Sequence, residues 1–286
     1  MAMTTNSFRA DLHCHTTASD GSESAETVMQ LAKQAGLSAL SITDHDTVAA
    51  YETAIPAAQQ HGILLLPGIE FSTILQGTSV HILGYGFRLD HPAILSLCAK
   101  HAERRKNRNL AMLERLDRLG MSLNYEDLTN AIPVELASIG RSIGRPHIAF
   151  ALVKKGYVET LQAAFEQYIG EGRPCFVQGD SFSVDETIDV IHQAKGIAVI
   201  AHPHLIKKTE LLNELLKKNF DGIECFYGKF PGAAYERWLK IAKYKNWLVT
   251  GGSDFHGKAK PNQQLGCSWI GQEPFQAILD SLPKHS

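Results

Sequence analysis

Short apolar runs rich in strand-forming residues alternate with helical patterns along most of this chain, and this alternation restricts the fold more than any other sequence feature. Such runs, separated by amphipathic helices, are typical of a mostly parallel sheet whose strands are joined by crossover helices. Residues 24–34 form the first helical pattern, which Gly36 terminates. The expected strands are residues 9–13, 39–43, 64–69, 80–84, 198–201, 222–224 and 248–250.

The alternation is interrupted in the middle of the chain. Between residues 90 and 180 the sequence holds several helical segments and almost no strand pattern, beginning with a long helix over residues 91–119 that Gly120 stops. Alternation resumes near residue 183. We therefore expect one discontinuous α/β domain, residues 8–88 and 183–286, and a helical insertion, residues 89–182.

Nearly every expected strand ends in a residue that can bind a metal ion. In the extended first strand, His13 and His15 point to the same face, so both imidazoles can reach one ion. Because α/β sheets and barrels place their sites at the C-terminal ends of strands, the side chains are expected to converge. The candidate ligands are His13, His15, Asp20, His45, Glu70, His81, His202, Asp254 and His256.

A single histidine at a strand end is more often a hydrogen-bonded structural residue than a ligand. Six histidines and three carboxylates at successive strand ends are better explained as one metal site. Imidazole and carboxylate without thiolate suit zinc, manganese or iron in a hydrolytic role. Nine ligands are too many for one ion and fit two or three divalent ions.

The composition is that of an ordinary globular protein and excludes several other classes. The 286 residues are 44% hydrophobic and 20% charged, which argues against disorder and a coiled coil. A net charge of -2 argues against bulk electrostatic binding of long duplex nucleic acid. Five scattered cysteines indicate neither disulfides nor a thiolate zinc site. Without a membrane span or a signal peptide pattern, a cytoplasmic protein with no membrane contact is expected.

The motifs resemble those of the PHP (polymerase and histidinol phosphatase) domain phosphoesterases. The matching segments are DLHCHTTASDG, ITDHDT, GIEFS, HILGYG, AHP and GSDFHG, in family order over the whole chain. The resemblance implies an α/β fold, a distorted (β/α)7 TIM-like barrel with a trinuclear site. The implied ligand sets are His13, His15, Glu70 and Asp254 for one ion, Glu70, His81 and His202 for a second, and Asp20, His45 and His256 for a third. Manganese is the expected metal, with zinc and iron as alternatives.

Within that family, the sequence is most similar to 3',5'-nucleoside bisphosphate phosphatases that also act as 5'-to-3' exoribonucleases. The similarity lies in the insertion, in an E-R-R-x-x-R helix at residues 103–108 and an R-x-H segment at residues 145–147. It implies an insertion that caps the metal site. It also implies hydrolysis of the 3'-phosphate of substrates such as 3'-phosphoadenosine 5'-phosphate, and trimming of the 5' ends of short single-stranded RNA.

The ligand set permits phosphate-ester hydrolysis without a protein nucleophile. A water bridging two ions is acidified toward hydroxide, and cationic side chains neutralise the remaining phosphate oxygens. The candidates for substrate binding are Arg104, Arg105, Arg108, Arg145 and His147. A basic run on a long helix is also typical of a solvated face, and Arg104 and Arg105 diverge by about 100° around the helix, so one shared role is not expected.

Other interpretations stay open on the sequence. A histidinol-phosphate phosphatase shares the metal motifs but has less need of the arginines. A non-catalytic metal-containing module would bind nucleotides or support a partner, although no ligand of the pattern is missing here. Asp44 and Asp46 flank His45, and each is expected either to orient an imidazole or to cap a helix beginning near Val48.

Overall fold

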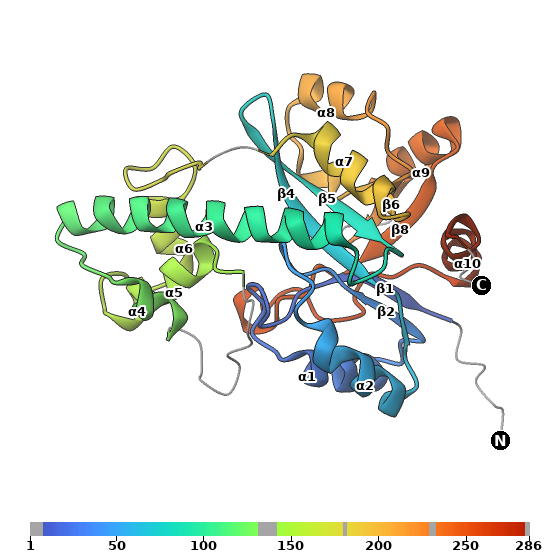
Figure 1. The fold of residues 1–286 in the computed structure, drawn as a ribbon, viewed down its shortest axis with the longest axis horizontal. Helices are drawn as coiled ribbons and strands as arrows, with labels where there is room; N and C mark the ends of the chain where they lie inside the picture. Colours follow the sequence, from blue (N-terminus) through green and yellow to red (C-terminus); the bar gives the residue numbers. More distant parts are fainter. Residues whose placement is uncertain (1–7, 131–141, 180–181, 229–232, 284–286) are drawn as a thin grey trace.

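The strands form a three-stranded and a five-stranded sheet in the computed structural model, which describes residues 8–130, 142–179, 182–228 and 233–283 (Figure 1). The first sheet has the order β1 (Ala10–Cys14), β2 (Ala39–Ile42), β3 (Leu64–Leu65). The second has the order β4 (Gly68–Leu75), β5 (Thr78–Tyr85), β6 (Ile197–Ile200), β7 (Gly222–Tyr227), β8 (Leu248–Gly252). Each of the seven runs expected as strands contains strand residues.

The topology differs in part from the expected parallel barrel. The first sheet is parallel, as is the succession β6, β7 and β8, but β5 pairs antiparallel with both β4 and β6. Gln76 and Gly77, both with positive φ, reverse the chain between β4 and β5, so no crossover helix separates these strands. Isolated bridges, Cys14 to Phe255 and His45 to Glu70, link the two sheets. A closed (β/α)7 barrel is not found, although the α/β class is confirmed.

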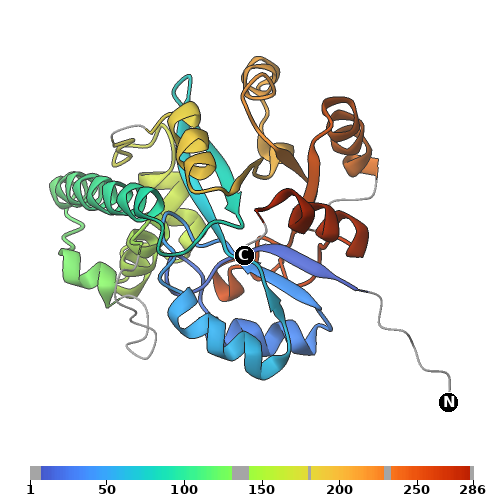
Figure 2. The same ribbon diagram turned by 45° about the vertical axis from the view of Figure 1, so that its right-hand side comes forward.

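Amphipathic helices pack against the two sheets. Within α1, whose Ser24 cap accepts a hydrogen bond from the backbone N–H of Thr27, the buried residues follow the helical repeat. It lies beside α2 against the first sheet, at the bottom of Figures 1 and 2. The helices of this part are α1 (Ala25–Gln34), α2 (Tyr51–His61), α7 (Val184–Gln193), α8 (Thr209–Leu215), α9 (Ala233–Lys245) and α10 (Gln272–Ser281), with 3-10 turns η3 (Pro203–Leu205) and η4 (Gly257–Ala259).

The long helix α3 (Pro92–Arg118) belongs to two hydrophobic cores. Near its start, Ile94 and Leu97 pack into the core beneath the second sheet. Near its end, Met112 and Leu116 pack into a separate core with the helices to the left in Figure 1. Those helices are α4 (Tyr125–Thr129), α5 (Arg145–Lys154), α6 (Leu161–Ala164) and the π-helical turn η2 (Phe165–Ile169). The middle of α3 joins these cores and carries the arginine run.

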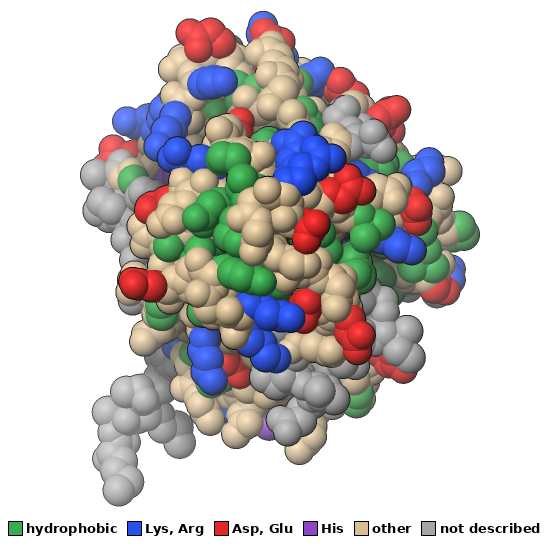
Figure 3. Space-filling view, turned by 90° about the vertical axis from the view of Figure 1, so that its left-hand side faces the viewer, with side chains coloured by type: hydrophobic (Ala, Val, Ile, Leu, Met, Phe, Trp, Pro, Cys, Tyr) green, Lys and Arg blue, Asp and Glu red, His purple; other side chains and the backbone are tan. Residues whose placement is uncertain are grey.

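No described helix is suited to cross a membrane, and the face seen in Figure 3 has no extended basic area. Among the described helices, even the 27-residue α3 is too polar to cross a bilayer. On the face seen in Figure 3, basic and acidic side chains are interspersed and almost no histidine is visible. His13 of β1 and His15, which directly follows that strand, are fully buried. Any ion that these two histidines bind would therefore lie inside the molecule.

A test of the fold lies at Gly252, the last residue of β8. A Cβ there would lie 2.4 Å from both the backbone nitrogen and the Cβ of His13. We expect Gly252→Ala to lower the free energy of unfolding by about 1–3 kcal/mol, because one of the two backbones must move. Urea denaturation measures the loss. Gly271→Ala is the control, since no atom lies within 4 Å of a Cβ at that position, and equal losses for the two variants would contradict this packing.

Candidate active site

The carboxylate of Glu70, on β4 and only 1% exposed, lies at the centre of the predicted ligands. Its two oxygens contact five imidazoles. Oε1 lies 2.8 Å from His81 Nδ1 and 2.9 Å from His202 Nε2, and Oε2 lies 3.1 Å from His15 Nε2, 3.2 Å from His45 Nδ1 and 3.3 Å from His13 Nε2. Although burial raises the pKa of Glu70, the histidines, led by His45 and His81, hold it well below its usual range. The carboxylate is therefore ionised.

The other two predicted carboxylates lie beside the same imidazoles. Asp254 Oδ1 lies 3.2 Å from His15 Nε2, and Asp20 Oδ1 lies 3.3 Å from His256 Nε2. Asp20 Oδ2 is 3.8 Å from His45 Nε2. The structure thus brings all nine predicted ligand residues together, and we call this set the histidine-carboxylate cluster.

The cluster contains three overlapping groups whose ligand atoms lie within 4.8 Å of one another. Each pair of groups shares one residue, which is His15, His45 or Glu70. The groups are His13, His15, Glu70 and Asp254; His15, Asp20, His45 and His256; and His45, Glu70 and His81. His202 lies outside these groups, but it contacts the same Glu70 oxygen as His81.

The surroundings of His15 show that divalent ions fit this set. The ring is fully buried, and neither of its nitrogens makes a hydrogen bond with any described residue, although Nε2 lies close to two carboxylates. A buried imidazole without hydrogen bonds is costly, whereas a ring directed at a shared cation would be satisfied. Against the effect of burial, Asp254 and Glu70 raise the pKa of His15 to about 9, so the site attracts positive charge strongly.

Three supporting residues were missed by the sequence analysis. Glu224 Oε1 lies 2.9 Å from His13 Nδ1, and its Oε2 accepts a hydrogen bond from the backbone N–H of His202 at 2.6 Å. Tyr227 and Lys260 each donate to Asp254 Oδ2 at 2.7 Å. Glu224 ends the expected strand 222–224, so the rule applied to the other strand ends would have identified it. Tyr227 and Lys260 give no comparable signal.

The backbone is strained at the site. Asp46, His202 and Asp254 have φ values of 59°, 26° and 52°, and they are half of the non-glycine residues with positive φ in the described ranges. Such conformations cost of order 1–3 kcal/mol each and persist where the surrounding structure enforces them. Here His202 and Asp254 direct their side chains to the other predicted ligands, whereas Asp46 directs its carboxylate to α3.

Asp44 and Asp46 bind separate partners, and neither caps α2, which begins at Tyr51 without a side-chain cap. Asp44 accepts hydrogen bonds from the backbone N–H and hydroxyl of Thr16, at 2.8 and 2.6 Å, and from the Ser19 hydroxyl. These bonds hold the loop that carries Asp20. Asp44 therefore supports the cluster through the backbone around Asp20.

Asp46 faces α3 instead. Its Oδ2 accepts from Nε and Nη2 of Arg105 at 2.7 and 2.5 Å, and its Oδ1 accepts from the backbone N–H of Ser72 at 2.8 Å. His101 Nδ1 lies 3.3 Å from Oδ1. Burial alone would raise the pKa of Asp46, but Arg105 and His101 hold it well below its usual range. A buried ion pair therefore joins α3 to the loop after β2.

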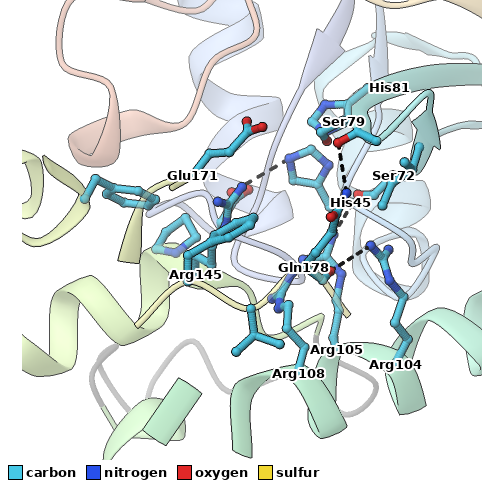
Figure 4. A pocket seen from close by; sticks show the side chains of 17 residues that line it. His45, Ser72, Ser79, His81, Arg104, Arg105, Arg108, Arg145, Glu171 and Gln178 are labelled. Carbon is cyan, nitrogen blue, oxygen red and sulfur yellow. Dashed lines mark hydrogen bonds and ion pairs between the residues drawn. The ribbon is translucent and has the colours of Figure 1, made fainter. Parts of the chain in front are cut away.

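A cavity of about 180 Å³ opens beside the cluster (Figure 4). We call it the arginine cavity, because four arginines line it together with Asp20, His45 and His81: Arg104, Arg105, Arg108 and Arg145. In Figure 4 the three arginines of α3 extend from that helix toward His45 and Ser72. Burial, together with Arg105 and Arg145, lowers the pKa of Arg108 well below its usual range. So many like charges in one cavity favour an anionic ligand.

The four arginines form contacts with different partners. Arg105 is paired with Asp46, whereas Arg104 donates to the carbonyl of Gln178 at 3.4 Å. Arg108 donates to Asn109 Oδ1 at 2.9 Å, and the Arg145 guanidinium lies 5.3 Å from the centre of the Phe176 ring. The expectation that they do not share one role agrees with these contacts.

His147 does not line the arginine cavity. Its ring is fully buried, and Nδ1 accepts a hydrogen bond from the backbone N–H of Gly144 at 3.1 Å. The expected contact with substrate is therefore not supported by its position, because the side chain turns back to cap the start of its own helix. Arg145, two residues earlier, reaches the cavity.

Comparison with known proteins gives the family of this chain. A family profile described as PHP domain matches residues 11–246. The chain belongs to the PHP domain family. It is 32% identical to a 5'-3' exoribonuclease of Haemophilus influenzae, over 95% of this chain and 96% of that protein. It is also 32% identical to a phosphoribosyl 1,2-cyclic phosphate 1,2-diphosphodiesterase of Eggerthella lenta, over 87% and 94%.

A third relative and a solved structure indicate the same class. The chain is 30% identical to a 3',5'-nucleoside bisphosphate phosphatase of Chromobacterium violaceum, over 90% of both proteins. A structure from Bifidobacterium adolescentis, described as a metal-dependent phosphoesterase, covers 96% of both chains at 32% identity, with a TM-score of 0.86. This PHP domain protein is therefore a metal-dependent phosphoesterase, and the family predicted from the motifs is confirmed.

A double-mutant cycle tests the ion pair between α3 and the loop after β2. Arg105→Ala leaves the Asp46 carboxylate buried without its partner, so we expect the free energy of unfolding to fall by about 3–5 kcal/mol. Adding Asp46→Ala should restore part of that loss, giving a clear coupling energy in urea denaturation. The exposed pair Arg88 and Asp90 is the control and should show almost no coupling. Independent effects at positions 46 and 105 would contradict the assignment.

Proposed function

We propose that this PHP domain protein removes the 3'-phosphate of 3',5'-nucleoside bisphosphates and trims nucleotides from the 5' end of short single-stranded RNA. The proposal rests on two neighbouring sites, each of which suits a phosphate. The histidine-carboxylate cluster fits divalent ions for the reacting phosphate, and the arginine cavity beside it suits a second phosphate. One relative is named for the exoribonuclease activity and another for the phosphatase activity. Each aligns with at least 90% of this chain, which supports the proposal.

In this proposal the cluster holds two or three divalent ions, manganese first, with zinc and iron as alternatives. Bound ions would acidify a water for attack and neutralise charge on the reacting phosphate. Glu70 would be shared between ions, because its two oxygens face different histidines and it belongs to two of the groups found in the structure. The proposed ligands are His13, His15, Asp20, His45, Glu70, His81, His202, Asp254 and His256.

The arginines would bind and orient the 5'-phosphate. We assign that contact to Arg108 and Arg145, because a guanidinium can donate two parallel hydrogen bonds to phosphate. Arg105 acts as a positioning residue, since its guanidinium is already bonded to Asp46 and Ser72. Arg104 shapes the cavity wall through the Gln178 carbonyl. The substrate is thereby held at both phosphates, with the reacting one against the cluster.

Residues 89–182 would form a cap over the α/β domain of residues 8–88 and 183–286. Two observations support this division. The helices of the insertion have their own hydrophobic core, and the insertion supplies all four arginines of the cavity. The cap would therefore select the substrate, while the α/β domain holds the metal ions.

A histidinol-phosphate phosphatase is less well supported. A substrate with one phosphate would leave the arginine cavity without an anion to offset its charge. A non-catalytic module does not agree with the enzymatic class that the family and the relatives show.

Arg145→Ala tests the role of the second phosphate. We expect KM for adenosine 3',5'-bisphosphate to rise at least about tenfold, because a charge-assisted hydrogen bond to phosphate is lost. KM for adenosine 3'-monophosphate should stay unchanged. Release of inorganic phosphate in the presence of manganese measures both values. Arg118→Ala, an exposed arginine at the end of α3, is the control, and an equal rise for both substrates would contradict the assignment.

Metal removal tests the cluster. Protein treated with a chelator should regain stability with manganese, by about 2.7 kcal/mol when free metal is 100 times its Kd. Glu70→Gln should abolish this gain, because the variant loses the central anionic ligand. Thermal unfolding with and without metal measures the effect. Glu103→Gln on the exposed side of α3 should keep the full gain, and a gain retained by Glu70→Gln would disprove the placement.

A further inference from the structure

A second cavity, of about 390 Å³, adjoins the arginine cavity. Ser79, His81, Arg145 and Glu171 line both. We call the second one the lysine cavity, because Lys207 and Lys208 line it. Its size exceeds that of the arginine cavity, so it offers room for more than a released phosphate ion.

The histidine-carboxylate cluster lies where the two cavities meet. The arginine cavity reaches the cluster at Asp20, His45 and His81, and the lysine cavity reaches it at His81 and His202. His81 and His202 both contact Glu70 Oε1. A phosphate held at this edge of the cluster would therefore have the arginine cavity on one side and the lysine cavity on the other.

The lining of the lysine cavity combines positive charge with apolar surface. Lys207 and Lys208 are exposed, and neither side chain forms an ion pair or hydrogen bond with a described residue. Leu205 is 50% exposed, and Ile206 and Leu211 lie beside it in the lining. Single-stranded nucleic acids are bound in positively charged grooves that follow the backbone, and here aliphatic surface lies where such grooves usually carry aromatic side chains.

The charge balance of the shared wall agrees with an anionic occupant. Glu171 is the carboxylate in the lining of the lysine cavity, and its charge acts on Arg145, which lines the same wall. Figure 4 shows these two side chains near one another. The two lysines are then left as uncompensated positive charge facing the cavity.

We propose that the lysine cavity binds the nucleotide downstream of the bond that is hydrolysed in a single-stranded RNA, an inference that rests on the proposed function. The 5'-terminal nucleotide would occupy the arginine cavity. Water adds to the phosphorus, and the bond from phosphorus to the 3'-oxygen of the first nucleotide breaks. That oxygen gains a proton, and the phosphate stays on the 5'-oxygen of the next nucleotide. The shortened chain thus leaves through the lysine cavity.

This geometry separates the two substrate classes. With a 3',5'-bisphosphate, the group lost from the 3'-oxygen is inorganic phosphate, which needs no contact with the lysines. With RNA, the lost group is a whole chain, whose next phosphate lies within reach of the cavity. The lining side chains are lysine and aliphatic residues, so contact with the backbone, without selection for one base, is expected.

The test compares the two substrates on the metal-loaded enzyme. The variant Lys207→Ala/Lys208→Ala should lower kcat/KM for a 5'-phosphorylated adenosine trinucleotide at least about tenfold, while kcat/KM for adenosine 3',5'-bisphosphate stays within about twofold. The slope of log kcat/KM for the trinucleotide against log salt should fall by about 0.7, since the contact with its one remaining phosphate is lost. Lys207→Arg/Lys208→Arg should retain activity on the trinucleotide.

Lys240→Ala/Lys243→Ala on α9 is the matched control, because it removes the same charge outside both cavities. Binding of a 3'-labelled trinucleotide to chelator-treated protein, measured by fluorescence anisotropy, gives a second readout and should weaken in the variant of Lys207 and Lys208 alone. Equal losses on both substrates, or no loss on either, would overturn the inference while the phosphatase activity stands. A wild-type protein that hydrolyses neither substrate would instead disprove the proposed function.

Discussion

The contact between one buried carboxylate and five imidazoles determines the rest of this site. Glu70 has almost no exposure, so its charge is stable only because histidines from β1, β5 and the segments after β2 and β6 surround it. These segments are far apart in the chain, and they meet because the two sheets adjoin there. Asp20 and Asp254 add further negative charge to the same volume. Three carboxylates with little exposure to solvent together need cations, so the packing of the strands is directly related to the chemistry.

The helix α3 is held to this site by a second buried charge. Asp46 follows His45 in the chain, yet it is bonded to Arg105 and lies close to His101 on α3. One side of the loop after β2 thus presents an imidazole to the cluster, and the other fixes the helix that carries the arginines. The distance between the two proposed phosphate sites is consequently set by a short loop and one ion pair.

Most of the clustered residues could be predicted because they lie at or just after the ends of β1, β2, β6 and β8, where the order of strands brings side chains together. Glu70 and His81 lie within β4 and β5 instead, so their part in the cluster depends on the pairing of these two strands. The antiparallel pairing of β4 with β5 could not be predicted, because an apolar run does not reveal the direction of the strand beside it. In addition, Gln76-Gly77 is a weaker turn signal than Asn-Gly. The pairing of Asp46 with Arg105 joins positions 59 residues apart and leaves no local pattern. The spacing of Arg145 and His147 likewise does not say which side chain turns inward to cap α5.

The continuity of α3 has a consequence for how such enzymes diversify. Because the described helix runs without a break from the core beneath the second sheet into the core that it forms with α5 and α6, the two cores are joined there by a continuous helix and not by a loop. If a segment from another protein replaced the chain from residue 89, its first helix would have to pack against this sheet. The middle of that helix would also have to bind Asp46 and Ser72, as Arg105 does here. Specificity can therefore be exchanged between relatives only as a matched set of helix and loop, and not as a detachable module.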